Sequence, residues 1–225
     1  MTSKIRAVIF DMDGVLTDSE PLINEAAIAM FKEKGLDVQP EDFIPFVGAG
    51  EERYVGGVAE KYNFPLDPVA AKNRTYEIYF ELVPHKLQAF PGVPELVESC
   101  RKAGLRVAVA SSADGNKVRV NLQEIGLPIE SWDAVITGER VEQKKPAPDI
   151  FLLAAQTLGV SPAECVVVED AENGVQAARA AGMRCVGVAQ TLPADHLGSA
   201  DVVREKIADV QLSDLAPGLD PGRRY

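Results

Sequence analysis

Residues 6–18 of the chain, RAVIFDMDGVLTD, hold an apolar run that stops at a pair of aspartates. The run at residues 6–10 does not alternate between apolar and polar side chains, which is typical of a strand covered on both faces. Asp11 and Asp13 leave this strand two residues apart, so both carboxylates can point to the same side. One carboxylate can then act as a nucleophile while the other handles protons. Gly14 lets the backbone turn sharply and come close to a ligand.

Four later segments repeat the pattern of the first run. These apolar runs lie at residues 105–110, 134–137, 165–168 and 185–188. The helical patterns before and between them end at Gly104, Gly126, Gly159 and Gly182. Glycine is the usual residue at the left-handed end of a helix. Because strands and helices that alternate in this way are joined by right-handed crossovers, we expect an α/β fold with a doubly wound parallel sheet.

Residues 18–89 interrupt this alternation, because they contain no strong strand pattern. The apolar face of residues 22–31 predicts one helix, and residues 67–82 predict another. We expect a small all-helical domain here, inserted into an α/β core made of residues 1–17 and 90–225. Such an insert would lie over the carboxyl ends of the strands, where open α/β sheets bind their ligands.

The composition excludes several classes of partner. The chain has 225 residues, is 46% hydrophobic and carries a net charge of −11, which disfavours nucleic acid and anionic membranes. No apolar run approaches the ~18 residues that span a bilayer. A small anionic substrate would therefore need a local positive site, such as a metal ion with lysines. We expect a monomer, either complete or one domain of a longer chain.

The cysteines and histidines are sparse. An odd count of three cysteines argues against a disulfide framework and indicates a reducing intracellular compartment. Cys165 and Cys185 lie in apolar runs, which favours buried packing, with a redox pair as the alternative. His85 and His196 are far apart in sequence, so we do not expect a histidine metal site.

Three further polar clusters follow the predicted strands. Ser111 and Ser112 come directly after one strand and offer a hydroxyl and a backbone amide to a phosphoryl oxygen. Lys145 provides a fixed cation before a helix, and Glu169 and Asp170 are hard oxygen ligands suited to Mg²⁺. Each cluster alone has an ordinary explanation as a loop, a helix cap or a solvated lysine. Together with the aspartate pair, at one edge of one sheet, they indicate a metal and phosphoryl site.

The order and spacing of these segments resemble the haloacid dehalogenase superfamily, in its phosphatase-type members with a helical cap after the first strand. The resemblance covers residues 5–213 and implies a Rossmannoid core. Its most specific motifs are FDMDGVLTDSE, KPAPDIF and VVVEDAENGVQAARAAG. The helical insert and the motif ASSAD are also similar to the hydrolase domain of the plant plastid suppressor-of-quenching proteins. We therefore expect the chain in the cytoplasm or the plastid stroma.

This resemblance implies a role for each phosphate-handling residue. Asp11 would attack the phosphoryl group in line and form an aspartyl phosphate. Asp13 would protonate the leaving oxygen and then deprotonate the hydrolytic water. Ser111, with Ser112 beside it, and Lys145 would bind the phosphoryl oxygens.

The resemblance also implies a metal site. Mg²⁺ would bridge Asp11, the backbone carbonyl of Asp13 and Asp170, with Glu169 as a further ligand or as a partner of the ligands. The metal and Lys145 would neutralise charge within an acidic protein. The function expected is that of a Mg²⁺-dependent phosphatase acting on a small phosphorylated metabolite.

Two alternatives lie within the superfamily. Dehalogenases lack the second aspartate that Asp13 provides. Mutases resembling β-phosphoglucomutase have a histidine on the first cap helix, whereas residues 19–27 here, SEPLINEAA, contain none. Glu51 lies near the place of the mutase arginine that grips a second phosphate, although Arg53 or Lys72 can substitute for it. The mutase therefore stays open as the second choice.

Two alternatives come from other classes of protein. A signalling receiver domain also phosphorylates an aspartate, but its acidic pair lies on the first strand and its phosphorylated aspartate on a later one. The insert at residues 18–89 would also be unexplained. A catalytically silent regulatory or binding domain would have no need of all four clusters.

The helical insert is where we expect specificity to arise. Residues 46–57, FVGAGEERYVGG, contain several glycines and are predicted to form a mobile loop that reaches the substrate. Glu51 and Arg53 in that loop offer polar contacts. Lys117, after the second strand, is expected to meet a second anionic group of the substrate. Each of these residues is otherwise an ordinary surface charge.

Overall fold

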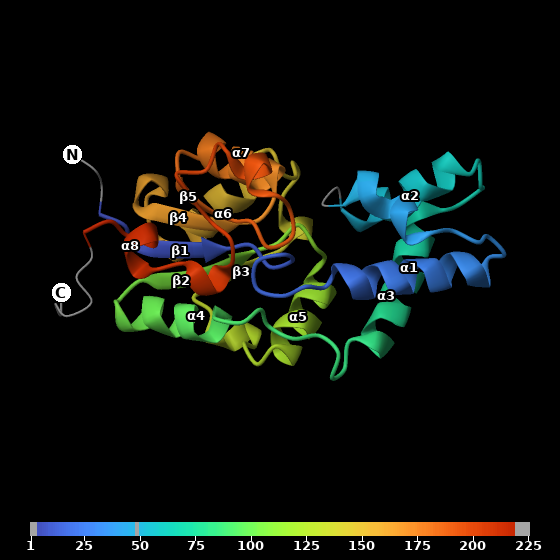
Figure 1. Ribbon diagram of the computed structural model, residues 1–225, viewed down its shortest axis with the longest axis horizontal. Coiled ribbons are helices and arrows are strands. Elements are labelled where there is room, and N and C mark those ends of the chain that lie inside the picture. Colours follow the sequence, from blue (N-terminus) through green and yellow to red (C-terminus); the bar gives the residue numbers. More distant parts are fainter. Residues whose placement is uncertain (1–3, 48–49, 219–225) are drawn as a thin grey trace. The chain divides into compact units, whose positions relative to one another are not determined.

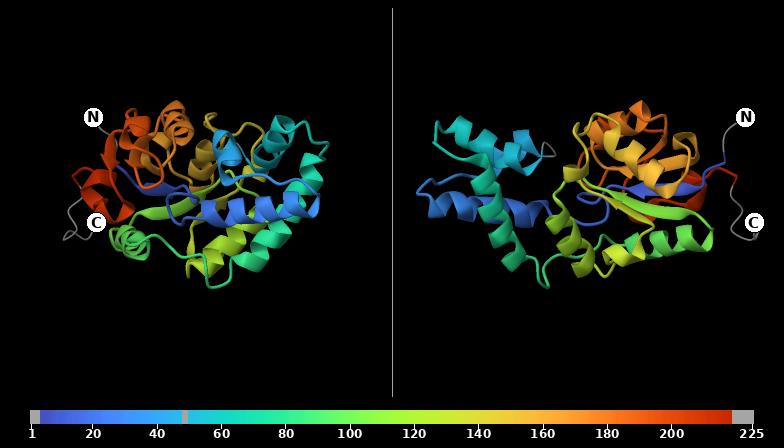
Figure 2. Two further views of the ribbon diagram at one scale, coloured as in Figure 1. Left: turned by 45° about the vertical axis from the view of Figure 1, so that its right-hand side comes forward. Right: turned by 180° about the vertical axis from the view of Figure 1, so that it is seen from behind.

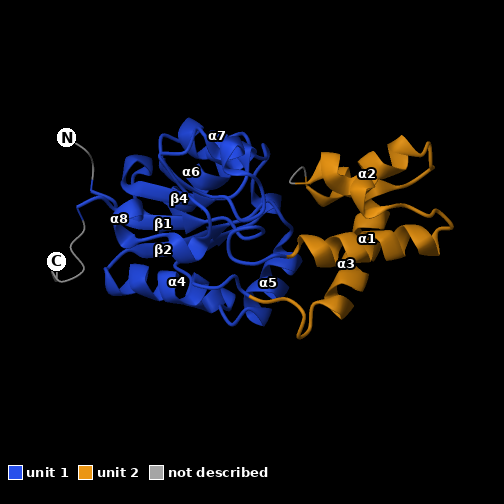
Figure 3. Ribbon diagram, in the orientation of Figure 1, with its two compact units in different colours: residues 1–18, 89–225 blue, residues 19–88 orange. Residues whose placement is uncertain are grey.

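The protein divides into two compact units (Figure 3). The computed structural model describes residues 4–47 and 50–218. One unit, Met1–Asp18 with Ala89–Tyr225, contains the β-sheet, and the other, Ser19–Gln88, is helical. Two backbone segments join them, and the bridge between Thr17 and Ala89 holds these segments side by side within the first unit.

The first unit is built on a six-stranded sheet in the order β3-β2-β1-β4-β5-β6, with every neighbouring pair parallel. This order confirms the doubly wound sheet, because two halves wind outward from the central β1 (Figure 1). The strands are β1 (Ala7–Phe10), β2 (Arg106–Ala110), β3 (Ala134–Ile136), β4 (Cys165–Glu169), β5 (Arg184–Val188) and β6 (Val202–Arg204). The first five were predicted, whereas β6 has only three half-buried residues and therefore no clear pattern.

Helices cover both faces of this sheet, with α6 and α7 on one side and α4 and α5 on the other (Figures 1 and 2). The helices are α4 (Val93–Lys102), α5 (Gly115–Glu124), α6 (Asp149–Leu158), α7 (Glu172–Ala180) and α8 (Leu212–Leu215). Short 3-10 turns are η2 (Ile129–Ser131), η3 (Gly138–Arg140), η4 (Pro162–Glu164), η5 (Ala194–Leu197) and η6 (Ile207–Asp209). Within the described residues, none of the helices has the length and apolar character to cross a bilayer.

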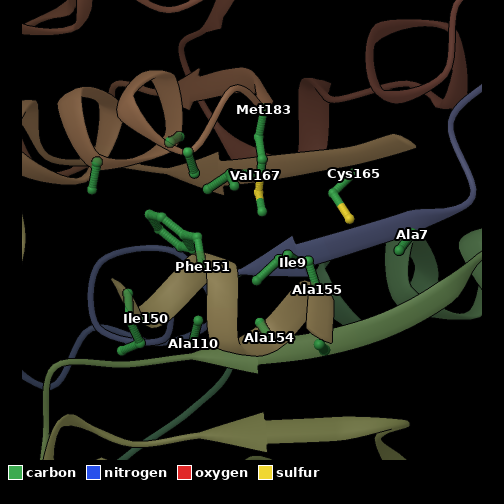
Figure 4. Packing of buried hydrophobic residues seen from close by; sticks show 14 of the residues in the cluster. Ala7, Ile9, Ala110, Ile150, Phe151, Ala154, Ala155, Cys165, Val167 and Met183 are labelled. Atoms are coloured by element: carbon green, nitrogen blue, oxygen red, sulfur yellow. The ribbon is translucent and has the colours of Figure 1, made fainter. Parts of the chain in front are cut away.

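The core between the sheet and α6 combines β-branched strand residues with small helix residues. Ile9 and Val167 pack against Phe151, while Ala154 and Ala155 let α6 lie close to the strands (Figure 4). All five are fully or almost fully buried. Burying a side chain such as Ile or Phe contributes roughly 1.5–3 kcal/mol, so this layer anchors β1 and β4 firmly.

Strand register brings the ends of β1, β2 and β4 to one edge. Phe10, the last residue of β1, pairs with Val109 on β2 and with Val168 on β4. The ladder continues one step further, where the Asp11 N–H donates to the Val168 carbonyl at 3.0 Å. The residues that follow these three strands therefore leave the sheet together, at the edge where parallel α/β sheets bind ligands.

The helical unit has an aromatic core. Its elements are α1 (Glu20–Glu33), η1 (Pro40–Phe46), α2 (Glu51–Lys61) and α3 (Pro68–Leu82). The Phe43 ring packs 4.8 Å from that of Tyr54 and 6.1 Å from that of Phe31, measured between centroids. The two helices predicted in this region are confirmed as α1 and α3.

The predicted mobile loop at residues 46–57 is wrong for its second half. Residues 51–57 form the start of α2, and Gly48 and Ala49 lie outside the described residues. Gly57 is a packing residue instead, because a Cβ atom there would lie 2.3 Å from Cε1 of Phe46. The sequence alone does not distinguish a glycine that makes room for an aromatic ring from a glycine that gives a loop its flexibility.

Candidate active site

Three buried carboxylates meet at the carboxyl edge of the sheet. Asp11 follows β1, Glu169 ends β4, and Asp170 comes next. One oxygen from each of them lies within 4.8 Å of the other two. All three residues are at most 8% exposed, so water screens their mutual repulsion poorly. This arrangement follows directly from the parallel pairing of β1 with β4.

A buried lysine partly balances these carboxylates. Lys145, in the turn before α6, donates to Oδ1 of Asp11 at 2.5 Å and also donates to Glu169. Burial alone would lower the pKa of this lysine, but the carboxylates of Asp11 and Glu169 outweigh burial and raise it. The ammonium therefore stays charged. Its Nζ also lies 4.9 Å from the ring centroid of Phe151, which anchors the side chain.

Glu169 is held rigidly by the turn between β4 and α7. Its Oε2 accepts the N–H groups of Asp170 at 2.9 Å and of Ala171 at 3.0 Å. Gly174 makes this position possible, because a Cβ atom there would lie 1.8 Å from Oε1 of Glu169. The carboxylate thus has one oxygen fixed by the backbone and the other by Lys145.

Asp170 is held by residues that sequence reasoning missed. The Thr191 hydroxyl donates to its carboxylate. Gln190 donates to the carbonyl of Gly14 at 2.8 Å and thereby ties the loop after β5 to the loop after β1. Gly14 has φ +83°, and a Cβ atom there would lie 2.0 Å from Oδ2 of Asp170. Gln190 and Thr191 closely follow β5, so the rule that found the other clusters also applies to them.

The electrostatics of the cluster favour a cation. Burial raises the pKa of Asp11 to about 7, against the opposing effect of Lys145. Burial also raises the pKa of Asp170 well above its usual value, and the charges of Glu169 and Asp11 add to this. One lysine is therefore too little positive charge for three carboxylates. Hard oxygen donors that converge on a small buried volume fit Mg²⁺, which would relieve the excess negative charge.

Asp13 is not one of the three clustered carboxylates, and it contacts a second lysine. Lys117 Nζ lies 3.2 Å from Oδ2 of Asp13, and Asn121 donates to Oδ1 at 3.5 Å. The loop that carries Asp13 is closed by a hydrogen bond from the Gly14 N–H to the Thr17 carbonyl at 2.8 Å. Asn121 was missed by sequence reasoning, although its i,i+4 spacing from Lys117 on α5 places both on one helix face.

Ser111 and Ser112 follow β2, beside β1. Ser111 is 1% exposed, and its Oγ accepts the N–H of Ala113 at 3.1 Å. The chain at Ser112 passes so close to Gly138 that a Cβ atom on the glycine would lie 2.1 Å from the Ser112 carbonyl oxygen. The serine loop therefore has a firm backbone position at the same sheet edge as Asp11.

The remaining predicted residues belong to the helical unit. Glu51 is the first residue of α2. Arg53 on the same helix donates to Glu60 at 2.7 Å, and its guanidinium carbon lies 5.0 Å from the centroid of the Phe46 ring. Within their own unit, these contacts place Arg53 in helix packing and surface charge pairing.

Sequence comparison finds one family and several relatives. The profile of the haloacid dehalogenase-like hydrolases matches residues 5–182. The chloroplastic protein suppressor of quenching 1 of Arabidopsis thaliana is 48% identical over 220 residues, which are 96% of this chain and 21% of that protein. The chain thus spans about a fifth of that relative's length. The fructose-1-phosphate phosphatase YqaB of Escherichia coli is 35% identical over 189 residues, 84% of this chain and 98% of that enzyme.

Structural comparison finds the same architecture in solved proteins. The crystal structure of CbbY from Rhodobacter sphaeroides, determined in complex with phosphate, superimposes with a TM-score of 0.84 at 27% sequence identity. The match covers 94% of this chain and 99% of that one. The range matched by the family profile, residues 5–182, includes Asp11, Lys145 and Glu169.

Proposed function

The chain belongs to the haloacid dehalogenase-like hydrolases, in their phosphatase and β-phosphoglucomutase-like branch, and we propose that it is a Mg²⁺-dependent phosphatase that acts through an aspartyl phosphate on Asp11. The observation that carries this proposal is the cluster of Asp11, Glu169 and Asp170 with Lys145 in contact with two of them. A nucleophilic carboxylate, a fixed cation and hard oxygen ligands are the parts that phosphoryl transfer requires.

The reaction divides into two displacements. In the first, a carboxylate oxygen of Asp11 bonds to phosphorus, the bond from phosphorus to the leaving oxygen breaks, and Asp13 gives that oxygen its proton. In the second, a water oxygen bonds to phosphorus while Asp13 takes the water proton, and the bond to Asp11 breaks. The products are an alcohol and inorganic phosphate, and both aspartates return to their starting states.

Other residues of the site position the phosphoryl group. Lys145 holds Asp11 and offers positive charge to the phosphoryl oxygens, and Ser111 and Ser112 are proposed to hold them from the neighbouring strand end. Asp11, Asp170, the Asp13 carbonyl and Glu169 would hold or orient Mg²⁺. When bound, Mg²⁺ supplies charge neutralisation for the phosphoryl group and its carboxylate nucleophile.

The proposed substrate is a small phosphorylated metabolite. The support is the relative from Escherichia coli, whose name gives fructose 1-phosphate as its substrate. We propose that the helical unit, Ser19–Gln88, acts as the cap that selects the substrate, and that Glu51 and Arg53 contribute to this choice.

A substrate panel tests this proposal. The panel contains sugar phosphates, sugar-alcohol phosphates, glycerol phosphate, phosphoglycolate and a folded phosphoprotein, each assayed with Mg²⁺ and with a chelator. Phosphate release from a small ester that needs Mg²⁺ and is absent in Asp11→Asn is the expected result. Release that persists in the chelator, or faster turnover of the phosphoprotein, would contradict it. NMR of the products detects any positional isomer and so identifies a mutase.

The cysteines support a reducing compartment, and we place the chain in the cytoplasm or the plastid stroma. Cys165 and Cys185 are buried on neighbouring strands, and burial raises the pKa of Cys165 to about 11. Burial raises the pKa of Cys185 further, so neither thiol is a ready nucleophile. Both residues are therefore assigned to core packing rather than to a redox pair. A thiol reagent should leave them unmodified until the protein unfolds.

A further inference from the structure

A second buried lysine faces the second catalytic aspartate. The Lys117 side chain is 3% exposed, whereas that of Asp13 is 22% exposed, and 3.2 Å separates the ammonium from Oδ2. Lysine is almost never buried to this extent without a charged or hydrogen-bonding partner. The site thus contains two lysine–aspartate pairs, Lys145 with Asp11 and Lys117 with Asp13.

Packing does not explain why a lysine occupies this place. Removing an ammonium from water costs several kcal/mol, which its ion pair repays only in part. An apolar side chain of similar length, such as methionine, is often neutral or stabilising at such positions. The Lys117 ammonium is buried despite this cost and contacts Asp13, which indicates that it acts on the Asp13 carboxyl group.

The second donor acts on the other carboxylate oxygen. Asn121 is fully buried, lies one helical turn after Lys117 on α5, and donates to Oδ1 of Asp13 at 3.5 Å. The two donors therefore approach different oxygens of one carboxylate from a single rigid helix. Because α5 starts just after the Ser111–Ser112 loop, one continuous segment carries both the serines proposed to bind the phosphoryl group and the two side chains that donate to Asp13.

We propose that Lys117 and Asn121 are positioning residues that orient the carboxyl group of Asp13 for its proton transfers. The inference rests on the proposed phosphatase function and assigns Lys117 to the enzyme's own aspartate rather than to a second anionic group of the substrate. Asp13 donates a proton to the leaving oxygen in the first displacement and accepts a proton from water in the second. Misplacing its carboxyl group slows both transfers.

A substrate with a good leaving group allows the effects on the two displacements to be measured separately. p-Nitrophenolate departs without a proton, so the first displacement with p-nitrophenyl phosphate does not need Asp13. The ratio kcat/KM reports this first displacement, whereas kcat also includes hydrolysis of the aspartyl phosphate. An alkyl phosphate from the panel needs Asp13 in both displacements.

The variants Lys117→Met and Asn121→Leu test the proposal. With p-nitrophenyl phosphate, each should keep kcat/KM within about threefold of wild type while kcat and KM fall together, kcat by about 10–100-fold. With the alkyl phosphate, kcat/KM should fall by about 10–100-fold as well. The double variant should lose less than the product of the two single losses, because both donors act on one carboxylate.

Controls separate positioning from folding and from substrate binding. Lys102→Met removes an exposed lysine from α4 and should leave all constants unchanged. The melting temperature of Lys117→Met should match or exceed that of wild type, and Asn121→Leu carries the test alone if Lys117→Met does not fold. Equal losses of kcat/KM with both substrates would overturn the inference, and so would a rise in KM confined to substrates with a second anionic group. Wild-type protein without phosphatase activity would overturn the proposed function itself.

Discussion

The two aspartates that are proposed to be catalytic, Asp11 and Asp13, differ in their surroundings although only Met12 separates them. Asp11 is buried among Glu169, Asp170 and Lys145, whereas the side chain of Asp13 keeps 22% of its surface exposed. A nucleophile benefits from a site that excludes competing water, while a proton carrier must reach the leaving group and the hydrolytic water. The exposure of each carboxyl group therefore suits the role proposed for it.

Replacing Gly174 with alanine is expected to change the stability of the protein in the opposite direction from most glycine-to-alanine substitutions in helices. Alanine normally stabilises a helix interior relative to glycine by up to about 1 kcal/mol. At Gly174 the new Cβ would lie 1.8 Å from Oε1 of Glu169 and would displace it, so Gly174→Ala should destabilise the protein by about 1–3 kcal/mol and reduce activity. Gly56→Ala in α2 is the matched control, since its nearest neighbours would lie 3.7 Å away. Thermal unfolding that ranks the two variants in the opposite order would contradict this account.

At the scale of elements, Asp42 joins η1 to the end of α2. Its carboxylate accepts the Gln39 N–H at 2.7 Å, the Tyr62 hydroxyl at 2.6 Å and the Lys61 ammonium at 2.5 Å. The hydrogen bond from Lys61 contributes most, followed by that from Tyr62, and together they lower the pKa of Asp42 to about 2. Because the folded pKa lies below the unfolded one, this cluster stabilises the helical unit fully above the unfolded value of 3.8.

This stabilisation should disappear as the pH falls from about 4 to about 2. Carbon NMR of the Asp42 carboxyl group in the intact protein should give a titration midpoint near 2. Asp42→Asn should remove this part of the pH dependence and destabilise the unit by about 1–2 kcal/mol at neutral pH. A midpoint near 4 would show that the three contacts do not form in solution.

Sequence patterns predicted whole elements better than contacts between them. The apolar runs identified five strands, because strands buried on both faces are apolar throughout. The ends of these strands indicated Asp11, Glu169 and Asp170, whereas Lys145 was predicted from its place before a helix. Gln190 and Thr191 were missed although they closely follow β5, and Asn121 was missed although it shares a helix face with Lys117. The partners of all three residues come from distant segments, so the sequence shows where the side chains lie but not what they contact. The glycines of α2 misled for a related reason, since the ring that requires Gly57 is ten or more residues away.

At the scale of the whole molecule, the net charge of −11 disfavours binding of an anionic substrate, and the proposed Mg²⁺ would offset that charge at the site. Activity should vanish in a chelator, return with Mg²⁺, and be inhibited when Ca²⁺ competes. Ca²⁺ takes more oxygen ligands than Mg²⁺ and takes them at longer distances. It would therefore draw the Asp11 carboxylate toward the metal and away from in-line attack. The inhibition is measured as the loss of phosphatase activity when Ca²⁺ is titrated at a fixed Mg²⁺ concentration. Equal activity with both ions would contradict the metal site assigned here.

The most direct test of the central claim is to trap the phosphoryl group on Asp11. Asp13→Asn mixed with p-nitrophenyl phosphate should release one p-nitrophenolate per active site in a burst, because hydrolysis of the intermediate then lacks its base. Acid quenching and peptide mass spectrometry should find the phosphoryl group on Asp11, and Asp11→Asn should show neither burst nor label. A phosphoryl group on any other residue, or an Asp11→Asn variant that keeps about a tenth of wild-type turnover, would contradict the account.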